Sequence, residues 1–302
     1  MRKSILVVIG IAALAAGYWW LTQDGRLTPR APYALDAQRL RALADALPGP
    51  KPTAVRYEKV SSFVFPHNMV VAGDDWGSTA IPAYAYQLAY PDHTAMIDAA
   101  MDRTLAKPDF MIQSFDDAAY ARVEHALLQA QLIVITHEHM DHIGGIAHHA
   151  QLASLLPALK LTDVQLAHPE AMKQAALPAG LMSAYQPIHY QGAVAIAPGM
   201  VLIAAPGHTP GSQMVYVKLA DGKELLFLGD VVWHARNIEV QRERPRWITA
   251  VVGEDRAAVS AEIAALHALS ERAPEVRQVP GHDGEVIDSL TRAGYLQAGF
   301  QS

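Results

Sequence analysis

The sequence predicts an α/β protein with two sheet-rich halves, each flanked by helices, behind an apolar N-terminal helix. Alternating strand patterns between residues 54 and 97 are followed by an amphipathic helix and a short apolar strand within 114–135. A similar mixture returns after residue 187, where several strands precede a helix, a strand and a closing helix. The 302 residues, 51% of them hydrophobic, suffice for one large domain or two small ones.

The N-terminal segment is a candidate membrane span. Arg2 and Lys3 precede an uncharged, apolar stretch that continues through Leu21, which is long enough to cross a bilayer as a helix. Trp19 and Trp20 lie at its far end, where aromatic belts occur. The positive flank predicts a single-pass anchor in the inner (cytoplasmic) membrane, with the rest of the chain outside the cytoplasm.

Two alternatives to an anchor remain for this segment. Cleavage of a signal peptide at the small residues 13–16 would release a periplasmic or secreted protein. A buried helix of a soluble domain is the third interpretation. The anchor is favoured over the signal peptide because apolar character continues through Leu21, past the small residues.

Three segments follow from the composition. Residues 1–21 are the signal anchor or signal peptide. Residues 22–53 hold five prolines around a helical pattern at 35–47, which predicts a linker with one short helix that stands off the membrane. Residues 54–302 form the folded domain.

Within this domain the elements can be assigned in order. Strands are predicted at 55–60, 62–71, 83–90, 94–97, 132–135, 164–167, 213–219, 225–229 and 276–279. Helices are predicted at 114–130, 146–156, 256–272 and 287–300. Asp221 and Gly222 predict a hairpin turn between two of the strands.

Composition excludes several classes of function. The chain has no cysteine, so disulfides, thiolate zinc sites and a catalytic thiol are excluded. Its net charge is −6 and it has no run of five or six like charges, which gives no indication of nucleic-acid binding. The expected partners are therefore a small-molecule substrate and, through the N-terminal helix, a membrane. The oligomeric state stays open.

The strongest functional signal is the stretch from Thr136 to His142. It places three histidines and two acids directly after an apolar strand and before Gly144. Such a cluster is unsuited to a core and well suited to a metal ion. His137 and His139 are two apart in an extended segment, so both can point to one side, while Asp141 and His142 are offset by the start of a turn.

Three later strand ends carry the same kind of side chain. His208 lies in a loop framed by glycine and proline, Asp230 follows an apolar strand, and His282 lies in a glycine turn after another strand. Each alone is typical of a polar surface residue. Together with the 136–142 stretch they predict one shared metal site.

With these motifs the sequence resembles the metallo-β-lactamase superfamily of metal-dependent hydrolases, from about residue 54 onward, and within it a lactonase-like subgroup. The resemblance implies a four-layer αββα sandwich with two Zn²⁺ ions at one edge between the sheets. It implies one zinc bound by His137, His139 and His208, a second by Asp141, His142 and His282, and a bridge between them by Asp230. Asp98, which follows a strand, is then a candidate partner of a metal-bound histidine.

The resemblance also implies a reaction. A hydroxide that bridges two zinc ions would attack an ester, lactone or related acyl bond, with Asp141 and Asp230 as the catalytic carboxylates. Phosphodiester or sulfate-ester hydrolysis and iron oxygenase chemistry at a single metal are the alternatives. Oxygen-reducing di-iron members usually carry Glu where this chain has His139. The nitrogen and carboxylate ligands suit zinc and tolerate iron or manganese.

The segment after Asp230 is expected to set the substrate. N-acyl homoserine lactone hydrolases carry a Tyr three residues after the bridging Asp, and this chain has Trp233, which can stack or donate through nitrogen but lacks the phenol. Trp233 and His234 are therefore predicted to line the substrate pocket. Arginines 242, 244 and 246 are typical of a solvated loop, with contact to an anionic substrate as the alternative. Trp76 is predicted as a rim aromatic or a core residue.

Overall fold

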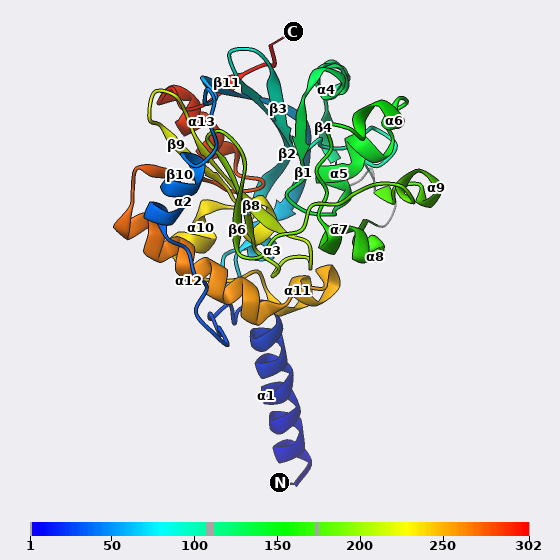
Figure 1. Ribbon diagram of the computed structural model, residues 1–302. Helices are drawn as coiled ribbons and strands as arrows, with labels where there is room; N and C mark the ends of the chain where they lie inside the picture. The colour runs from blue at the N-terminus through cyan, green and yellow to red at the C-terminus, as the bar shows by residue number, and fades with distance from the viewer. Residues whose placement is uncertain (1, 107–111, 173–174, 302) are drawn as a thin grey trace.

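Two facing sheets with helices on their outer sides form the body of the protein (Figure 1). The computed structural model describes residues 2–106, 112–172 and 175–301. The four layers are those that the resemblance implies, so the predicted αββα architecture is confirmed.

The first sheet has the order β11-β1-β2-β3-β5, with β4 paired to β1. Its strands are β1 (Ala54–Pro66), β2 (Ser78–Ala89), β3 (Thr94–Ile97), β4 (Ile112–Phe115), β5 (Leu132–Val134) and β11 (Gln297–Ala298). Because β3 and β5 are parallel, their carboxyl ends lie at the same edge of the sheet. Asp98 and the 136–142 stretch follow these two ends.

The second sheet has the order β10-β9-β8-β7-β6. Its strands are β6 (Ala193–Ala197), β7 (Met200–Ala204), β8 (Gln213–Lys218), β9 (Glu224–Phe227) and β10 (Val276–Val279). The predicted hairpin joins β8 and β9 as an antiparallel pair. The parallel pair of β9 and β10 brings Asp230 and His282 to one edge, since each follows its strand directly.

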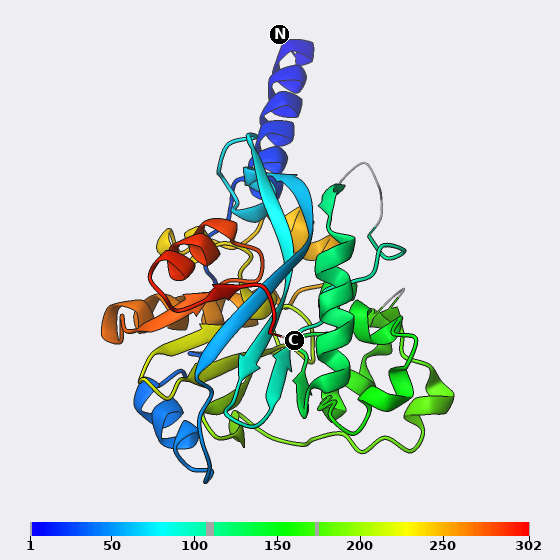
Figure 2. The same cartoon turned by 90° about the horizontal axis from the view of Figure 1, so that it is seen from above.

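Helices cover the two outer faces (Figure 2). The helices on the side of the first sheet are α4 (Asp117–Gln129), α5 (Met140–Ala147), α6 (Leu152–Leu155), α7 (Asp163–Ala167), α8 (Pro169–Met172) and α9 (Ala179–Met182). Those on the side of the second sheet are α2 (Ala37–Ala44), α10 (Ala235–Glu239) and α12 (Arg256–Arg272). Helix α11 (Arg246–Val252) instead packs through Ile248 against the apolar cluster on the side of the first sheet. The remaining helices are α1 (Arg2–Thr22), α3 (His67–Val70), the 3₁₀ turn η3 (Gly229–Val231) and α13 (Gly284–Arg292).

Three apolar clusters hold these layers together, one under each helical face and one between the sheets. The cluster between the sheets includes residues at or near the carboxyl ends of four strands, namely Ile97, Val134, Phe227 and Val279, all of them buried. Close packing of these strand ends fixes the backbone from which the polar loops begin.

Four predicted elements differ from the structure. The helix expected at 146–156 is divided between the end of α5 and the short helix α6. The strand expected at 164–167 is helix α7, because Thr162 and Gln165 form a reciprocal capping box at its start. The closing helix ends at Arg292 rather than at residue 300, and Gly294 follows with a φ of 73°, which only glycine adopts readily. The strand expected at 62–71 ends at Pro66 and gives way to α3.

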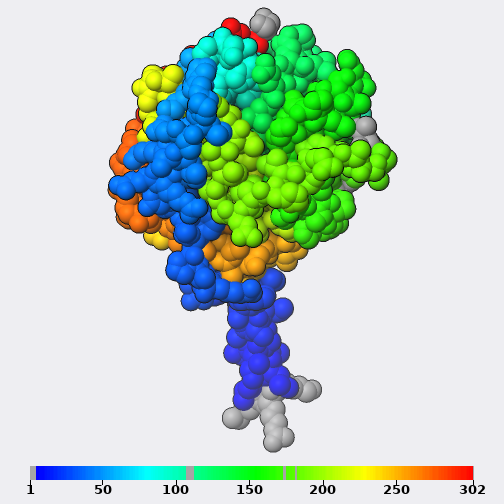
Figure 3. Space-filling view, viewed as in Figure 1, coloured from blue at the N-terminus to red at the C-terminus, as the bar shows by residue number. Residues whose placement is uncertain are grey.

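Helix α1 projects from the body as a stalk (Figure 3). Its segment Ile5–Thr22 has a mean hydropathy of 2.0 and is 6% buried, so it is long and apolar enough to cross a membrane. Residues 22–53 lie against the second sheet: Leu40 of α2 is buried, and the Arg41 Nε lies 2.9 Å from Glu224 Oε1. The domain boundaries at residues 21 and 53 stay a prediction.

Candidate metal centre

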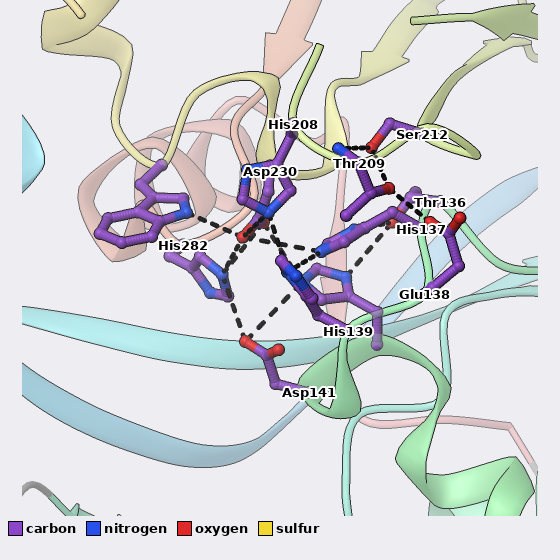
Figure 4. Close-up of polar contacts among 12 residues, drawn as sticks. Thr136, His137, Glu138, His139, Asp141, His208, Thr209, Ser212, Asp230 and His282 are labelled. Carbon is purple, nitrogen blue, oxygen red and sulfur yellow. Dashed lines mark hydrogen bonds and ion pairs between the residues drawn. The ribbon is translucent and has the colours of Figure 1, made fainter. Parts of the chain in front are cut away.

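Four strand ends bring the seven predicted ligands to one edge of the sandwich (Figure 4). The loop after β5 supplies four of them, with His139 as the N-cap of α5. The loop after β7 supplies His208, the η3 turn after β9 supplies Asp230, and the turn after β10 supplies His282. The seven side chains form two groups, and within each group the candidate ligand atoms lie within 4.8 Å of one another.

The first group consists of His137, His139, His208 and Asp230. Nδ1 of His139 lies 2.9 Å from Nε2 of His208 and 3.2 Å from Nε2 of His137. Asp230 joins them through Oδ2, which is 3.4 Å from Nε2 of His208 and 3.8 Å from Nε2 of His137. Three nitrogens and one carboxylate oxygen therefore converge on a common point.

The second group consists of Asp141, His142 and His282. Oδ2 of Asp141 lies 3.8 Å from Nε2 of His142 and 3.5 Å from Nε2 of His282. Oδ1 of Asp230 lies 3.2 Å and 3.1 Å from the same two nitrogens. Asp230 thus presents one oxygen to each group.

These side chains fit a bound cation better than they fit one another. Nε2 of His142 and Oδ1 of Asp230 are buried, and neither has a hydrogen-bond partner within the described part of the chain. Leaving such buried polar atoms unsatisfied costs about 1–3 kcal/mol each. A divalent cation between them would accept both lone pairs, and the absence of thiolate suits zinc, iron or manganese.

In the first group the protonation states also suit a cation. Burial lowers the pKa of His139 to about 3, and it lowers the pKa of His137 well below its usual value. Both imidazoles are therefore neutral and carry a free lone pair. Burial alone would raise the pKa of Asp230, but His282, His142 and His137 hold it well below its usual value, so the group is a carboxylate.

A glycine makes room for the Asp230 carboxylate. A Cβ at Gly281 would lie 2.4 Å from Oδ1 of Asp230 and 2.8 Å from the Gly229 carbonyl oxygen. No side chain can occupy that space, so glycine directly before His282 lets the β10 turn approach the β9 turn closely.

The outer nitrogens of the second group have fixed partners. Nδ1 of His142 lies 2.8 Å from Oδ2 of Asp98, and the Thr136 amide and hydroxyl donate to the same carboxylate at 2.7 and 2.8 Å. Nδ1 of His282 lies 2.7 Å from the Pro82 carbonyl oxygen. The structure thus places Asp98 beside a candidate ligand, as the sequence predicted, and such partners orient the imidazoles.

The outer nitrogen of His208 has a partner that sequence reasoning missed. Its Nδ1 lies 2.6 Å from Oε1 of Glu254, which follows α11, and Arg244 donates a hydrogen bond to the same oxygen. Both the Glu254 and the Arg244 side chains are almost completely buried. Nothing in the sequence marks Glu254, because it lies in a loop and far along the chain from His208.

Glu138 is a second residue that the sequence analysis missed, although it lies inside the 136–142 stretch. It is fully buried, its Oε1 accepts the Gly211 amide at 3.0 Å, and its Oε2 accepts the Thr209 hydroxyl. Burial raises its pKa. The side chain joins the loop after β5 to the loop that carries His208, so it fixes the distance between the two.

Trp233 and His234 lie where the chain leaves the metal centre. The indole N–H of Trp233 donates to Oδ2 of Asp230 at 2.8 Å, so this donor is already engaged. His234 lines a cavity of about 980 Å³ between the β1–β2 connection, α10 and α13. A substrate role for either residue stays a prediction.

The arginine run after Trp233 is only partly solvated: Arg242 is exposed, but Arg244 is buried and Arg246 half-buried, so the solvated-loop interpretation was wrong for these two. Arg244 is 2% exposed, donates to the Asp230 carbonyl oxygen at 3.0 Å, and lies 4.9 Å from the centre of the Trp233 ring. Arg246 pairs with Asp24 at 3.2 Å. Arg244 is therefore part of the support of the metal centre and is not free to meet an anionic substrate.

The chain belongs to the metallo-β-lactamase superfamily, whose family model matches residues 78–293. Together with the His/Asp cluster, this membership makes the protein a metal-dependent hydrolase. The recognition from sequence motifs is thereby confirmed. A comparison with curated proteins found no match.

Solved structures agree with this fold. An N-acyl homoserine lactone hydrolase with the product N-hexanoyl-L-homoserine bound at its catalytic metal centre has a TM-score of 0.60 and 16% identity, covering 79% of this chain and 96% of that chain. A probable metal-dependent hydrolase from Staphylococcus aureus has a TM-score of 0.58 and 11% identity, covering 78% and 91%. A dizinc quorum-quenching lactonase has a TM-score of 0.50 and 14% identity, covering 78% and 89%. At these identities the likeness concerns the fold.

Proposed function

We propose that this protein is a dinuclear zinc hydrolase that cleaves an ester, a lactone or a related acyl bond. The observation that carries the proposal is the placement of Asp230 between the two groups. Its Oδ1 lies 3.1 Å from Nε2 of His282 and its Oδ2 lies 3.4 Å from Nε2 of His208. A carboxylate that offers one oxygen to each of two nitrogen-rich groups is suited to bridging two cations.

Zinc is favoured by the donor set. Five imidazoles and two carboxylates match the nitrogen and oxygen ligands of catalytic zinc sites. The fold is also that of a dizinc lactonase. When bound, two such ions supply Lewis-acid polarisation of an acyl carbonyl and make water acidic enough to ionise near neutral pH.

The two carboxylates of the centre would have different tasks. The Asp230 side chain is 4% exposed and is held by Trp233, so it orients the site and cannot easily move. The Asp141 side chain is 21% exposed at the start of α5. Asp141 is therefore the group that can accept a proton from the attacking water and pass it to the leaving oxygen.

An acyl substrate is favoured over a phosphodiester or sulfate ester by the structural neighbours, several of which are lactonases. One iron per chain would instead favour oxygenase chemistry. Arg244, which donates to the Asp230 carbonyl oxygen, is buried and bound to Glu254, so it is not free to meet an anionic group.

The test combines metal analysis with a substrate panel of ester, lactone, thioester, phosphodiester and β-lactam compounds. We expect two zinc ions per chain and turnover of an ester or lactone. Asp230→Asn should lose at least one ion and about 100-fold or more in activity, whereas Asp92→Asn at the exposed far edge should change neither. Full turnover with two bound ions in Asp230→Asn would contradict the proposal, as would turnover of the phosphodiester alone.

For the remainder of the chain we propose that α1 is an uncleaved anchor in the cytoplasmic membrane, followed by residues 22–53 and a hydrolase domain at 54–302. The apolar span and its terminal tryptophans support this arrangement. Sodium carbonate extraction of membranes provides the test. The full chain should stay in the pellet, and release of a shortened chain into the soluble fraction would favour the signal peptide.

A further inference from the structure

Helix α1 joins the body at the same edge as the metal centre. The connection between β1 and β2 contacts its last turns: Trp76 Nε1 donates to the Tyr18 hydroxyl at 3.3 Å, and Asn68 Nδ2 donates to the Thr22 carbonyl oxygen at 3.1 Å. The same connection leads into β2, where the Pro82 carbonyl oxygen meets His282. The segment from the β1–β2 connection to Pro82 therefore contacts both α1 and the second ligand group.

A second loop links the stalk to the first ligand group. The Arg246 guanidinium lies 4.9 Å from the centre of the Trp20 ring, and Nη2 of Arg246 lies 3.2 Å from Oδ2 of Asp24. Two residues earlier in this loop, Arg244 binds Glu254, the partner of His208. The loops that hold the metal centre thus also hold the base of α1, and α1 leaves the body beside α11 (Figure 1).

Exposed apolar side chains surround this junction. Trp19 is 49% exposed, Trp20 52%, Trp76 53% and Val251 on α11 73%. We call these four residues the apolar rim. Trp247, next to Arg246, packs against the buried apolar cluster that contains Trp233, so α11 is connected by packing to the surroundings of the metal centre. Exposed large apolar groups gathered at one site indicate a binding surface.

The apolar helix α1 indicates that a lipid bilayer covers this binding surface. The apolar window Ile5–Thr22 has 18 residues, which corresponds to about 27 Å of helix, close to the thickness of a hydrocarbon core at about 30 Å. Its end coincides with the rim, because Trp76 touches Tyr18. Arg26 and Arg30 follow with side chains 76% and 83% exposed, as suits the headgroup region.

We propose that the rim lies in the membrane interface and holds the metal-centre edge against the bilayer, so that the substrate is an amphiphile whose acyl chain stays in the lipid while its carbonyl reaches the metal centre. The amphiphilic substrate rests on the proposed acyl hydrolase function. The membrane contact of the rim rests on the junction between α1 and the body alone. His139 and Asp141 are the partly exposed members of the centre.

The membrane contact can be measured without activity. Since the chain has no cysteine, Val251→Cys carries a single environment-sensitive fluorophore, and Asp92→Cys, exposed in the turn between β2 and β3 at the opposite edge, is the matched control. Each labelled full chain is placed in nanodiscs at one chain per disc, which excludes contact with a second copy. Brominated lipids should quench the label at position 251 and leave the label at position 92 unchanged. Equal, weak quenching at both positions would overturn the membrane contact.

The substrate class is tested with two esters that share the scissile bond, one short and water-soluble, the other long-chained and resident in the disc. Val251→Glu should lower the activity ratio of long to short ester by about tenfold or more, equivalent to 1.4 kcal/mol. Leu128→Glu, at an exposed apolar residue on α4 at the far edge, should leave the ratio unchanged. An unchanged ratio in Val251→Glu would overturn delivery from the membrane. If the parent protein hydrolyses neither ester, the hydrolase assignment fails while the fluorescence result still decides the membrane contact.

Discussion

Two imidazoles of the metal centre bind buried carboxylates, but the two carboxylates are stabilised in different ways. Asp98, beside His142, accepts neutral hydrogen bonds from the Thr136 amide and hydroxyl. Glu254, beside His208, meets the positive charge of Arg244 in a site where both side chains are almost fully buried. Asp98 is thus stabilised by donors from a neighbouring strand end, whereas Glu254 is stabilised by an ion pair with Arg244.

The difference concerns the free-energy cost of burying each carboxylate, which is higher for Glu254. Burial alone would raise the pKa of Glu254, but Arg244 and His208 hold it below its usual value. Removing Arg244 would leave an uncompensated buried charge, whereas Asp98 would keep its backbone donor after loss of the Thr136 hydroxyl. The Glu254 side should therefore be the more fragile of the two.

The largest effect is expected for Arg244→Met. This change should lower the free energy of unfolding by about 3–5 kcal/mol, because Glu254 would stay buried without its cation. Urea unfolding of the metal-loaded protein measures it. The double variant Arg244→Met/Glu254→Gln should recover part of the loss, since the stranded charge is gone. No recovery in the double variant would show that Arg244 acts through packing on Trp233 rather than through its charge.

Glu262 extends the comparison to a buried carboxylate that has no ion pair among the described residues. Burial raises its pKa to about 8 from its usual value near 4.5. The folded protein then keeps a proton that the unfolded chain loses, so the free energy of unfolding should fall as pH rises from about 4.5 to 8. The fall is limited to about 5 kcal/mol by the size of the shift.

Glu262→Gln should remove this slope. The variant should match the parent near pH 4.5 and exceed it increasingly up to pH 8, as followed by urea unfolding across the range. Parallel curves for variant and parent would contradict the assignment of a buried, protonated Glu262.

The two supports can be separated by Asp98→Asn and Glu254→Gln. Each change should weaken metal binding by about 10–100-fold, but at different ions: Asp98→Asn at the ion near His142, Glu254→Gln at the ion near His208. Chelator competition, followed as two release steps, measures both. If both variants lose the same ion first, the two groups do not act as separate binding sites.

Trp233→Phe should have an effect of similar size, shared between both ions. The substitution keeps an aromatic ring beside Arg244 but removes the N–H that donates to Asp230 at 2.8 Å. A lost hydrogen bond to a charged group is worth about 1.5–3 kcal/mol, which should appear as weaker binding of both ions. Weaker substrate binding with unchanged metal affinity would instead support a direct substrate contact by Trp233.

The same comparison explains what the sequence could predict. The two helix-flanked sheet halves and the polar residues at strand ends followed from the strand patterns, and Asp98 follows such a strand as well. The αββα layers and the division of seven ligands between two metals came from the resemblance to the family. Arg244 and Glu254 lie just before and just after α11, where no periodic pattern links them to His208. Glu138 could not be distinguished by sequence from the candidate ligands around it. Only its burial and its contact with Gly211 show that it joins two loops.

Electron paramagnetic resonance of the chain loaded with Mn²⁺ tests the central claim most directly. If Asp230 bridges two cations, the protein should bind two Mn²⁺ per chain and give an exchange-coupled spectrum, which Asp230→Asn should convert to that of isolated ions. A single, uncoupled Mn²⁺ per chain in the parent protein would contradict a bridged dinuclear centre.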